Sequence, residues 1–122
     1  ANGVPSVVVL NAGWTKAATL ASLSRKDLDD ELTGNFTTSA HLCLALLPAM
    51  RKLDGDKSFV FTSSVNALTH FGNPAYSAAK AAGMAWMRAL AAEEGKHRVR
   101  ANAVIPASTR MGSAIGGRSR YS

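Results

Sequence analysis

Three short apolar stretches alternate with two longer helical patterns along this chain. The first stretch, residues 7–10, is an unbroken Val-Val-Val-Leu run, and Ser58–Thr62 and residues 98–105 form the other two. A short run without alternation is typical of a strand that is buried on both faces of a parallel sheet. We therefore predict three strands, the first two of them buried, that end at Asn11-Ala12-Gly13, Ser63-Ser64 and Pro106.

The first helical pattern covers residues 24–52. Ser24 and Asp27 stand as N-cap and N3 residues, which is a carboxylate version of the capping box. Gly34 and Asn35 interrupt the apolar stripe of this helix, and Asn35 points inward with the stripe because it lies three residues after Leu32. An inward Asn has four hydrogen-bonding valences to satisfy, so Asn35 is either a structural polar plug or a functional residue. The stripe itself comprises Leu28, Leu32, Phe36, Ala40, Leu47 and Met50.

The second helical pattern covers residues 74–94. Asn73 is the expected N-cap, Pro74 suits the first helical position, and Gly95 is expected to end the helix as its C′ residue. At 100° per residue this helix has two distinct faces. One face carries Tyr76, Lys80, Gly83, Met87 and Leu90, and the opposite face carries only alanines, Ala78, Ala82, Ala85, Ala89 and Ala92.

The order strand, helix, strand, helix, strand predicts an α/β fold with a parallel sheet and right-handed crossovers. We expect residues 1–106 to form this unit and residues 107–122, which are rich in Gly, Ser and Arg, to form a loop or flexible tail.

Composition removes several function classes. The 122 residues are 47% hydrophobic and 18% charged, and no apolar run approaches the roughly 20 residues of a membrane span. The net charge of +6 is spread along the chain without interleaved aromatic residues, which argues against a nucleic-acid site. The three histidines are far apart, so no metal site is expected. The single cysteine, Cys43, lies in an apolar context that indicates a buried thiol and a reducing, cytoplasmic location.

Tyr76 and Lys80 are one helical turn apart on the same face. A phenol titrates near 10 and is a poor acid or base at neutral pH, but a nearby ammonium favours the phenolate. The pair can therefore carry general acid/base chemistry. Taken alone it is weak evidence, because Tyr-x-x-x-Lys is also frequent on ordinary surface helices.

The surrounding motifs resemble the short-chain dehydrogenase/reductase family. The segment Thr62-Ser63-Ser64-Val65 followed by Tyr76-Ser77-Ala78-Ala79-Lys80 resembles the active-site segment of that family. Asn11-Ala12-Gly13 is similar to its Asn-Asn-Ala-Gly motif, with Leu10 in place of the first Asn. Asn35 falls where the family has its catalytic Asn, and the segment from Arg100 to Pro106 resembles the strand before its Pro-Gly motif. Four motifs in the right order extend nearly from end to end.

The resemblance implies a three-layer parallel sheet in which this chain is the βαβαβ catalytic half of a doubly wound Rossmann fold. It implies an enzyme that transfers hydride between NAD or NADP and a carbonyl or alcohol substrate. Tyr76 would be the acid/base and Lys80 would lower its pKa and hold the nicotinamide ribose. Asn35 would hold a water in a proton relay to Lys80.

Other roles follow from the same resemblance. Ser64 would stabilise the charge that develops on the substrate oxygen. Ser63 stays open as its alternative, because the interval from Ser64 to Tyr76 is one residue short of the commonest spacing. Asn11 would brace the strand end, while Ala12 and Gly13 would let the cofactor approach the backbone. Thr109, about two residues early, would contact the nicotinamide.

The sequence also departs from the family pattern. The glycine-rich phosphate loop is not found, so the residues that select NAD over NADP and the groups that cradle a pyrophosphate are not expected in this stretch. An alternative hypothesis is therefore a truncated, non-catalytic remnant that acts as a helix-mediated association module. In either case we expect a homo-oligomer, because the alanine face of the second helix permits close approach of another backbone.

Overall fold

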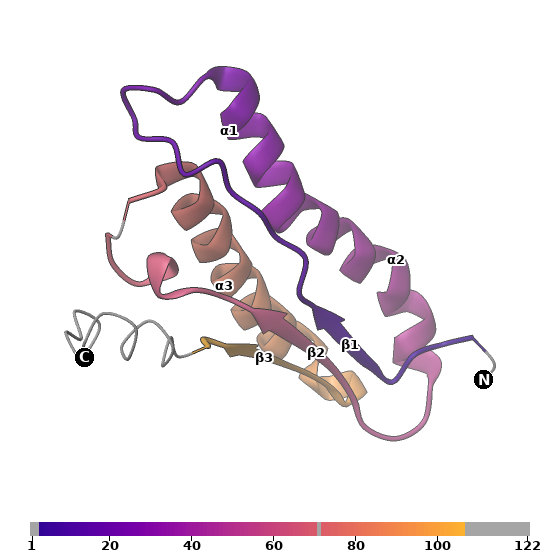
Figure 1. The fold of residues 1–122 in the computed structure, drawn as a ribbon. Coiled ribbons are helices and arrows are strands. Elements are labelled where there is room, and N and C mark those ends of the chain that lie inside the picture. Colours follow the sequence, from indigo (N-terminus) through magenta and orange to yellow (C-terminus); the bar gives the residue numbers. More distant parts are fainter. Residues whose placement is uncertain (1–2, 71, 107–122) are drawn as a thin grey trace.

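The computed structural model describes residues 3–70 and 72–106 of the chain, shown in Figure 1. Within these residues strands and two helical stretches alternate as the sequence pattern predicts, and the structure adds short helical turns that were not predicted. In chain order they are β1 (Val7–Leu10), α1 (Arg25–Leu32), η1 (Thr33–Thr37), α2 (Thr38–Lys52), β2 (Lys57–Thr62), η2 (Val65–Ala67), α3 (Pro74–Glu94), η3 (Gly95–His97) and β3 (Val99–Val104).

The three strands form one parallel sheet in the order β1-β2-β3. Val7 of β1 pairs with Ser58 of β2, and Ser58 pairs in turn with Arg100 of β3. Each connection crosses over through a helix, because parallel neighbours cannot be joined by a tight hairpin. The predicted α/β parallel architecture is confirmed.

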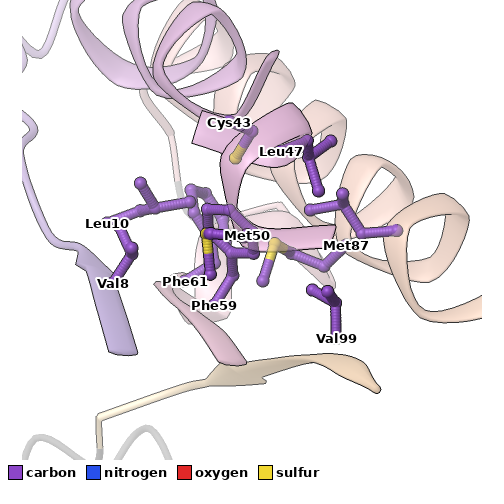
Figure 2. Close-up of a cluster of buried hydrophobic side chains, with 10 residues drawn as sticks. Val8, Leu10, Cys43, Leu47, Met50, Phe59, Phe61, Met87 and Val99 are labelled. Atoms are coloured by element: carbon purple, nitrogen blue, oxygen red, sulfur yellow. The ribbon is translucent and has the colours of Figure 1, made fainter. Parts of the chain in front are cut away.

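Both long helices cover the same face of the sheet. A single cluster joins β1 and β2 with Cys43, Leu47 and Met50 of α2 and Met87 and Leu90 of α3 (Figure 2). Phe59, Met50 and Cys43 are fully buried, so burial of this apolar surface is the main source of stability. The buried state predicted for Cys43 is confirmed.

The opposite face of the sheet is open over the described ranges. Val7 and Val9 are each 60% exposed and Val104 is 47% exposed, whereas Val8 and Leu10 are buried. The sequence interpretation of β1 as buried on both faces is therefore wrong for residues 3–70 and 72–106. An unbroken valine run does not distinguish a covered face from an uncovered one, and the third layer expected from the resemblance does not lie among these residues.

The helical stretch 24–52 is interrupted where the sequence suggests. Gly34 and Asn35 lie in η1, a π-helical turn that joins α1 to α2. The Ser24 hydroxyl accepts a hydrogen bond from Asp27 N, which confirms the N-cap. The Asp27 carboxylate pairs with Lys16 Nζ at 2.9 Å.

Two predicted helix ends differ from expectation. Asn73 precedes Pro74 at the start of α3, but it adopts the left-handed conformation (φ 53°) and its side chain caps nothing within the described residues. Gly95 continues in right-handed conformation (φ −59°) into η3, and Arg98 is the residue with positive φ (62°). The residue with positive φ is therefore Arg98, three positions after the predicted Gly95. The shift arises because η3 extends the helix by one tighter turn.

Candidate active site

The predicted site residues gather at one end of the sheet. The carboxyl ends of β1 and β2 lead into Asn11-Ala12-Gly13 and Ser63-Ser64, and the first turns of α3 carry Tyr76 and Lys80. Carboxyl ends of neighbouring parallel strands meet at the same edge, which is where open α/β sheets bind ligands.

Lys80 is the best-buried cation at this end, with 3% of its surface exposed. Its Nζ donates a hydrogen bond to Thr62 O at 3.1 Å. The same nitrogen lies 5.1 Å from the centre of the Phe61 ring and 5.6 Å from the centre of the Tyr76 ring. Burial lowers the pKa of Lys80 from its ordinary value, because desolvation penalises the charged form. The structure thus brings Lys80 and Tyr76 together.

Asn35 is fully buried, and main-chain groups use three of the four hydrogen-bonding valences of its side chain. Its Oδ1 accepts from Trp14 N at 2.9 Å, and its Nδ2 donates to Trp14 O at 2.7 Å and to Glu31 O at 2.9 Å. The side chain therefore holds the segment after β1 against η1.

Gly13 links Asn35 to Lys80. A Cβ atom added at Gly13 would lie 2.6 Å from Asn35 Oδ1 and 3.1 Å from Lys80 Nζ. Any side chain at this position would therefore clash with one or both polar groups. The small residue keeps Asn35, Lys80 and the backbone after β1 within one compact site.

The two serines after β2 differ in their surroundings. Ser64 is half-buried, and its hydroxyl bonds to Asn66 Oδ1 at 3.2 Å and accepts from Asn66 N at 3.1 Å. Ser63 is 4% exposed, and its hydroxyl has no hydrogen-bond partner among the described residues. Asn66 also reaches Ser77 Oγ of α3 at 3.3 Å, so Ser64 is tied to the start of that helix.

The family model of the short chain dehydrogenases matches residues 5–119, which is nearly the whole chain. The chain belongs to the short chain dehydrogenase family. Among relatives of this family, an uncharacterised oxidoreductase of Mycobacterium tuberculosis is 39% identical over 107 residues, which cover 87% of this chain and 40% of that protein.

Solved structures of short chain dehydrogenases have the same fold. An oxidoreductase of Burkholderia thailandensis superposes with a TM-score of 0.81 at 36% identity, covering 86% of this chain and 41% of that one. A 3-oxoacyl-[acyl-carrier protein] reductase of Brucella melitensis with bound NAD gives a TM-score of 0.79 at 29% identity, covering 84% of this chain and 42% of that one. The chain therefore spans about two fifths of the length of these short chain dehydrogenases.

The remaining site predictions are placed as follows. Asn11, Ala12 and Gly13 are exposed at the end of β1, where a ligand can reach their backbone. Thr109 lies outside the described residues. Residues 3–70 and 72–106 contain no group of His, Cys, Asp or Glu side chains suited to a metal ion. No helix in the same ranges is long and apolar enough to cross a membrane.

Two residues beside this candidate site, Glu31 and Gly34, were not predicted from the sequence. Glu31 is 1% exposed and its main-chain carbonyl binds Asn35, yet the pattern gave it no role. The indole of Trp14 packs directly against Gly34, because a Cβ atom added at Gly34 would lie 2.3 Å from Trp14 Nε1. A signal was present for Glu31, because Asp27, Glu31 and Asn35 recur at a spacing of four and form a polar stripe beside the apolar one.

Proposed function

We propose that this chain carries the acid/base site of an NAD(P)-dependent oxidoreductase that interconverts carbonyl and alcohol groups. The observation that carries the proposal is the buried Lys80 ammonium, which faces the Tyr76 ring and lies beside Gly13 and Asn35. Burying a cation costs free energy unless it is paired and hydrogen-bonded, and Lys80 Nζ has one hydrogen bond, to Thr62 O, and no carboxylate partner among the described residues, so this arrangement favours a functional role over an ordinary helix pair.

Tyr76 is the proposed acid/base. In reduction its hydroxyl donates a proton to the substrate oxygen, and in oxidation its phenolate takes that proton back. The Lys80 ammonium lies 5.6 Å from the centre of the Tyr76 ring and is the proposed electrostatic partner of that residue. Ser64 is proposed to donate a hydrogen bond to the same substrate oxygen, with Ser63 as the alternative donor.

The residues at the end of β1 fit a nicotinamide cofactor. Asn11, Ala12 and Gly13 are exposed, so a ligand can approach their backbone from outside, while the Cβ direction of Gly13 is filled by Asn35 and Lys80. Asn11, Ala12, Gly13, Tyr76 and Lys80 are proposed to hold NAD or NADP, with Thr109 as a further contact. When bound, the cofactor supplies or accepts the hydride.

The test is cofactor binding, compared between the 122-residue chain and a full-length protein that carries it. We expect the full-length protein to bind NADH or NADPH and the chain alone to bind weakly or not at all, because the chain carries no glycine-rich phosphate loop. Calorimetry or nicotinamide fluorescence gives both affinities. If the full-length protein binds neither nucleotide, the proposed function is wrong. Micromolar binding by the chain alone would show that a phosphate site lies within it.

A second candidate function, association through α3, is favoured by the alanine face. Ala78, Ala85, Ala89 and Ala92 are exposed in the described chain and Ala82 is half-buried, so α2 does not cover this face. Small side chains let another helix approach closely, which supports a homo-oligomer. We expect Ala85→Arg to dissociate the assembly without loss of folding, as measured by light scattering and circular dichroism. A monomeric wild-type chain, or an assembly that survives Ala85→Arg, would contradict this proposal.

The proposed location is the cytoplasm, which is supported by the buried, free thiol of Cys43.

A further inference from the structure

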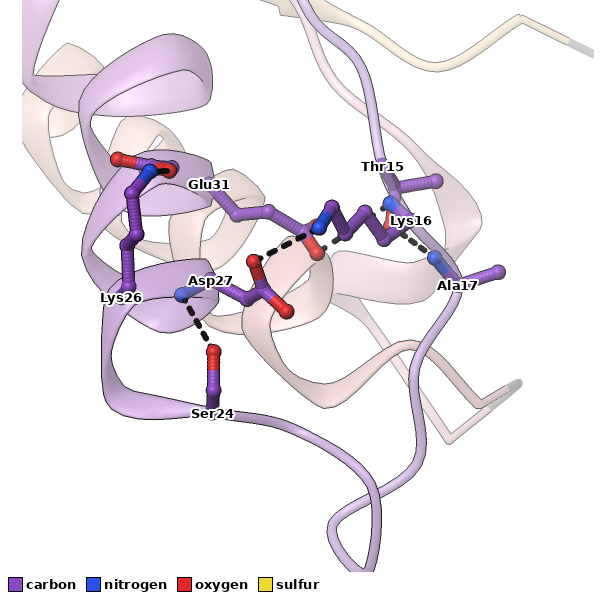
Figure 3. A network of polar contacts seen from close by, with 8 residues as sticks. Thr15, Lys16, Ala17, Ser24, Lys26, Asp27 and Glu31 are labelled. Carbon is purple, nitrogen blue, oxygen red and sulfur yellow. Dashed lines mark hydrogen bonds and ion pairs between the residues drawn. The ribbon is translucent and has the colours of Figure 1, made fainter.

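Three polar side chains on one face of α1 and η1 hold the segment that follows β1, residues 14–17. Asp27, Glu31 and Asn35 are spaced four residues apart, so they lie one above another on the helix surface. Asp27 Oδ1 pairs with Lys16 Nζ at 2.9 Å, and Glu31 Oε2 accepts from Lys16 N at 3.3 Å (Figure 3). Asn35 makes two hydrogen bonds to the main chain of Trp14. Segment 14–17 is thus attached at three successive turns.

Glu31 is the unusual member of this set. It is 1% exposed, and its second carboxylate oxygen, Oε1, is buried without a hydrogen-bond partner among the described residues. A carboxylate that is buried with one backbone donor gains less from that bond than it loses in desolvation. Stability alone would therefore favour an apolar residue at this position.

The contacts of Glu31 lead directly to the candidate active site. Its carboxylate holds Lys16 N, and its main-chain carbonyl accepts from Asn35 Nδ2 at 2.9 Å. Asn35 in turn lies against Gly13, where an added Cβ would be 2.6 Å from Oδ1. The place of segment 14–17 on the helix therefore fixes the backbone at Gly13 and the orientation of the Asn35 amide.

We propose that Glu31 is a positioning residue of the candidate active site, which holds Lys16 on α1 and, because Asn35 binds the neighbouring Trp14, helps to set the place of Asn35 and Gly13. The part of this proposal that concerns catalysis rests on the proposed function. The attachment of segment 14–17 to the helix is independent of the proposed function, because it follows from the contacts alone.

The experiment compares Glu31→Leu and Glu31→Gln in the 122-residue chain. A leucine side chain is similar in size to glutamate but has no hydrogen-bond acceptor. A glutamine side chain keeps an oxygen that can accept from Lys16 N. The readouts are the rate of tryptic cleavage after Lys16, followed by mass spectrometry, and the free energy of unfolding. We expect Leu to speed this cleavage about tenfold, because one charge-assisted hydrogen bond is lost, while the free energy of unfolding stays equal or rises. Gln should restore the wild-type cleavage rate.

Asp30→Asn is the matched control. Asp30 precedes Glu31 on the same helix, is paired with Lys26 and has a side chain that is 43% exposed. We expect this variant to leave cleavage after Lys16 unchanged. The proposal is overturned if Leu does not change that rate, if Gln cleaves as fast as Leu, or if Leu lowers the free energy of unfolding in proportion to the faster cleavage.

A turnover measurement separates this proposal from the proposed function. In a full-length protein that carries the chain, Glu31→Leu should lower kcat, and Glu31→Gln should restore it. If carbonyl reduction is not detected at all, the proposed function fails, yet the cleavage experiment still decides whether Glu31 holds segment 14–17.

Discussion

Replacing Tyr76 with Phe should reduce carbonyl reduction by a full-length protein carrying this chain by about 10²–10⁴-fold, the usual contribution of a general acid. The substitution removes one hydroxyl and keeps the ring, whose centre lies 5.6 Å from Lys80 Nζ. Cofactor affinity should therefore change little. The measurement is steady-state oxidation of NADH or NADPH with a carbonyl substrate, together with a cofactor titration of the same variant.

Ser64→Ala and Ser63→Ala provide the comparison for this experiment. The proposal places the larger loss of kcat at Ser64, whereas a larger loss for Ser63→Ala would assign the oxyanion donor to the buried hydroxyl that has no partner among the described residues. Retention of most activity by Tyr76→Phe would show that another group transfers the proton.

Gly83→Ala should destabilise the fold strongly. A Cβ atom at Gly83 would lie 2.1 Å from Phe61 Cζ, and Phe61 is 1% exposed in the core between α3 and the sheet. Ala is favoured over Gly in a helix, but forced overpacking of a closed core costs about 1–3 kcal/mol. We expect a net loss of free energy of unfolding, measured by urea denaturation with far-ultraviolet circular dichroism.

Gly95→Ala is the matched control for Gly83→Ala. Gly95 has right-handed φ (−59°), and an added Cβ would meet no atom within 4 Å in the described structure. This second Gly→Ala change should be neutral or stabilising by up to about 1 kcal/mol. Equal effects of the two substitutions would mean that the Phe61 ring moves aside. Because that ring also contacts Lys80, a shift of Phe61 would alter the candidate active site as well.

The order of elements was predictable from the sequence because apolar periodicity is a local property. The pattern located β1, the Ser24 cap and the interruption at Gly34 and Asn35 to within a few residues. The approach of Lys80 to Gly13 and Thr62 followed from topology, since β1 and β2 are parallel and their carboxyl ends share one edge.

The differences arise where tertiary contacts decide between local options. The conformations of Asn73 and Gly95 depend on the loops that enter and leave α3, which the residue types do not specify. The exposed state of Val7 and Val9 depends on what covers the sheet, and a strand of four apolar residues carries no information about that. Glu31 binds Lys16 N across fifteen positions, a contact that no local pattern specifies.

The pairing of the strands also determines how quickly this architecture can assemble. Val7 pairs with Ser58, and Ser58 pairs with Arg100, so paired residues of neighbouring strands are more than forty positions apart in the sequence. Closing such loops loses chain entropy before any pairing contact is gained, which makes parallel sheets slow to nucleate. A 21-residue helix such as α3 needs only local contacts and forms within about a microsecond. Helix formation is therefore expected to precede strand pairing. Among the described residues β2 pairs with both β1 and β3, so the sheet forms only once β2 is in place.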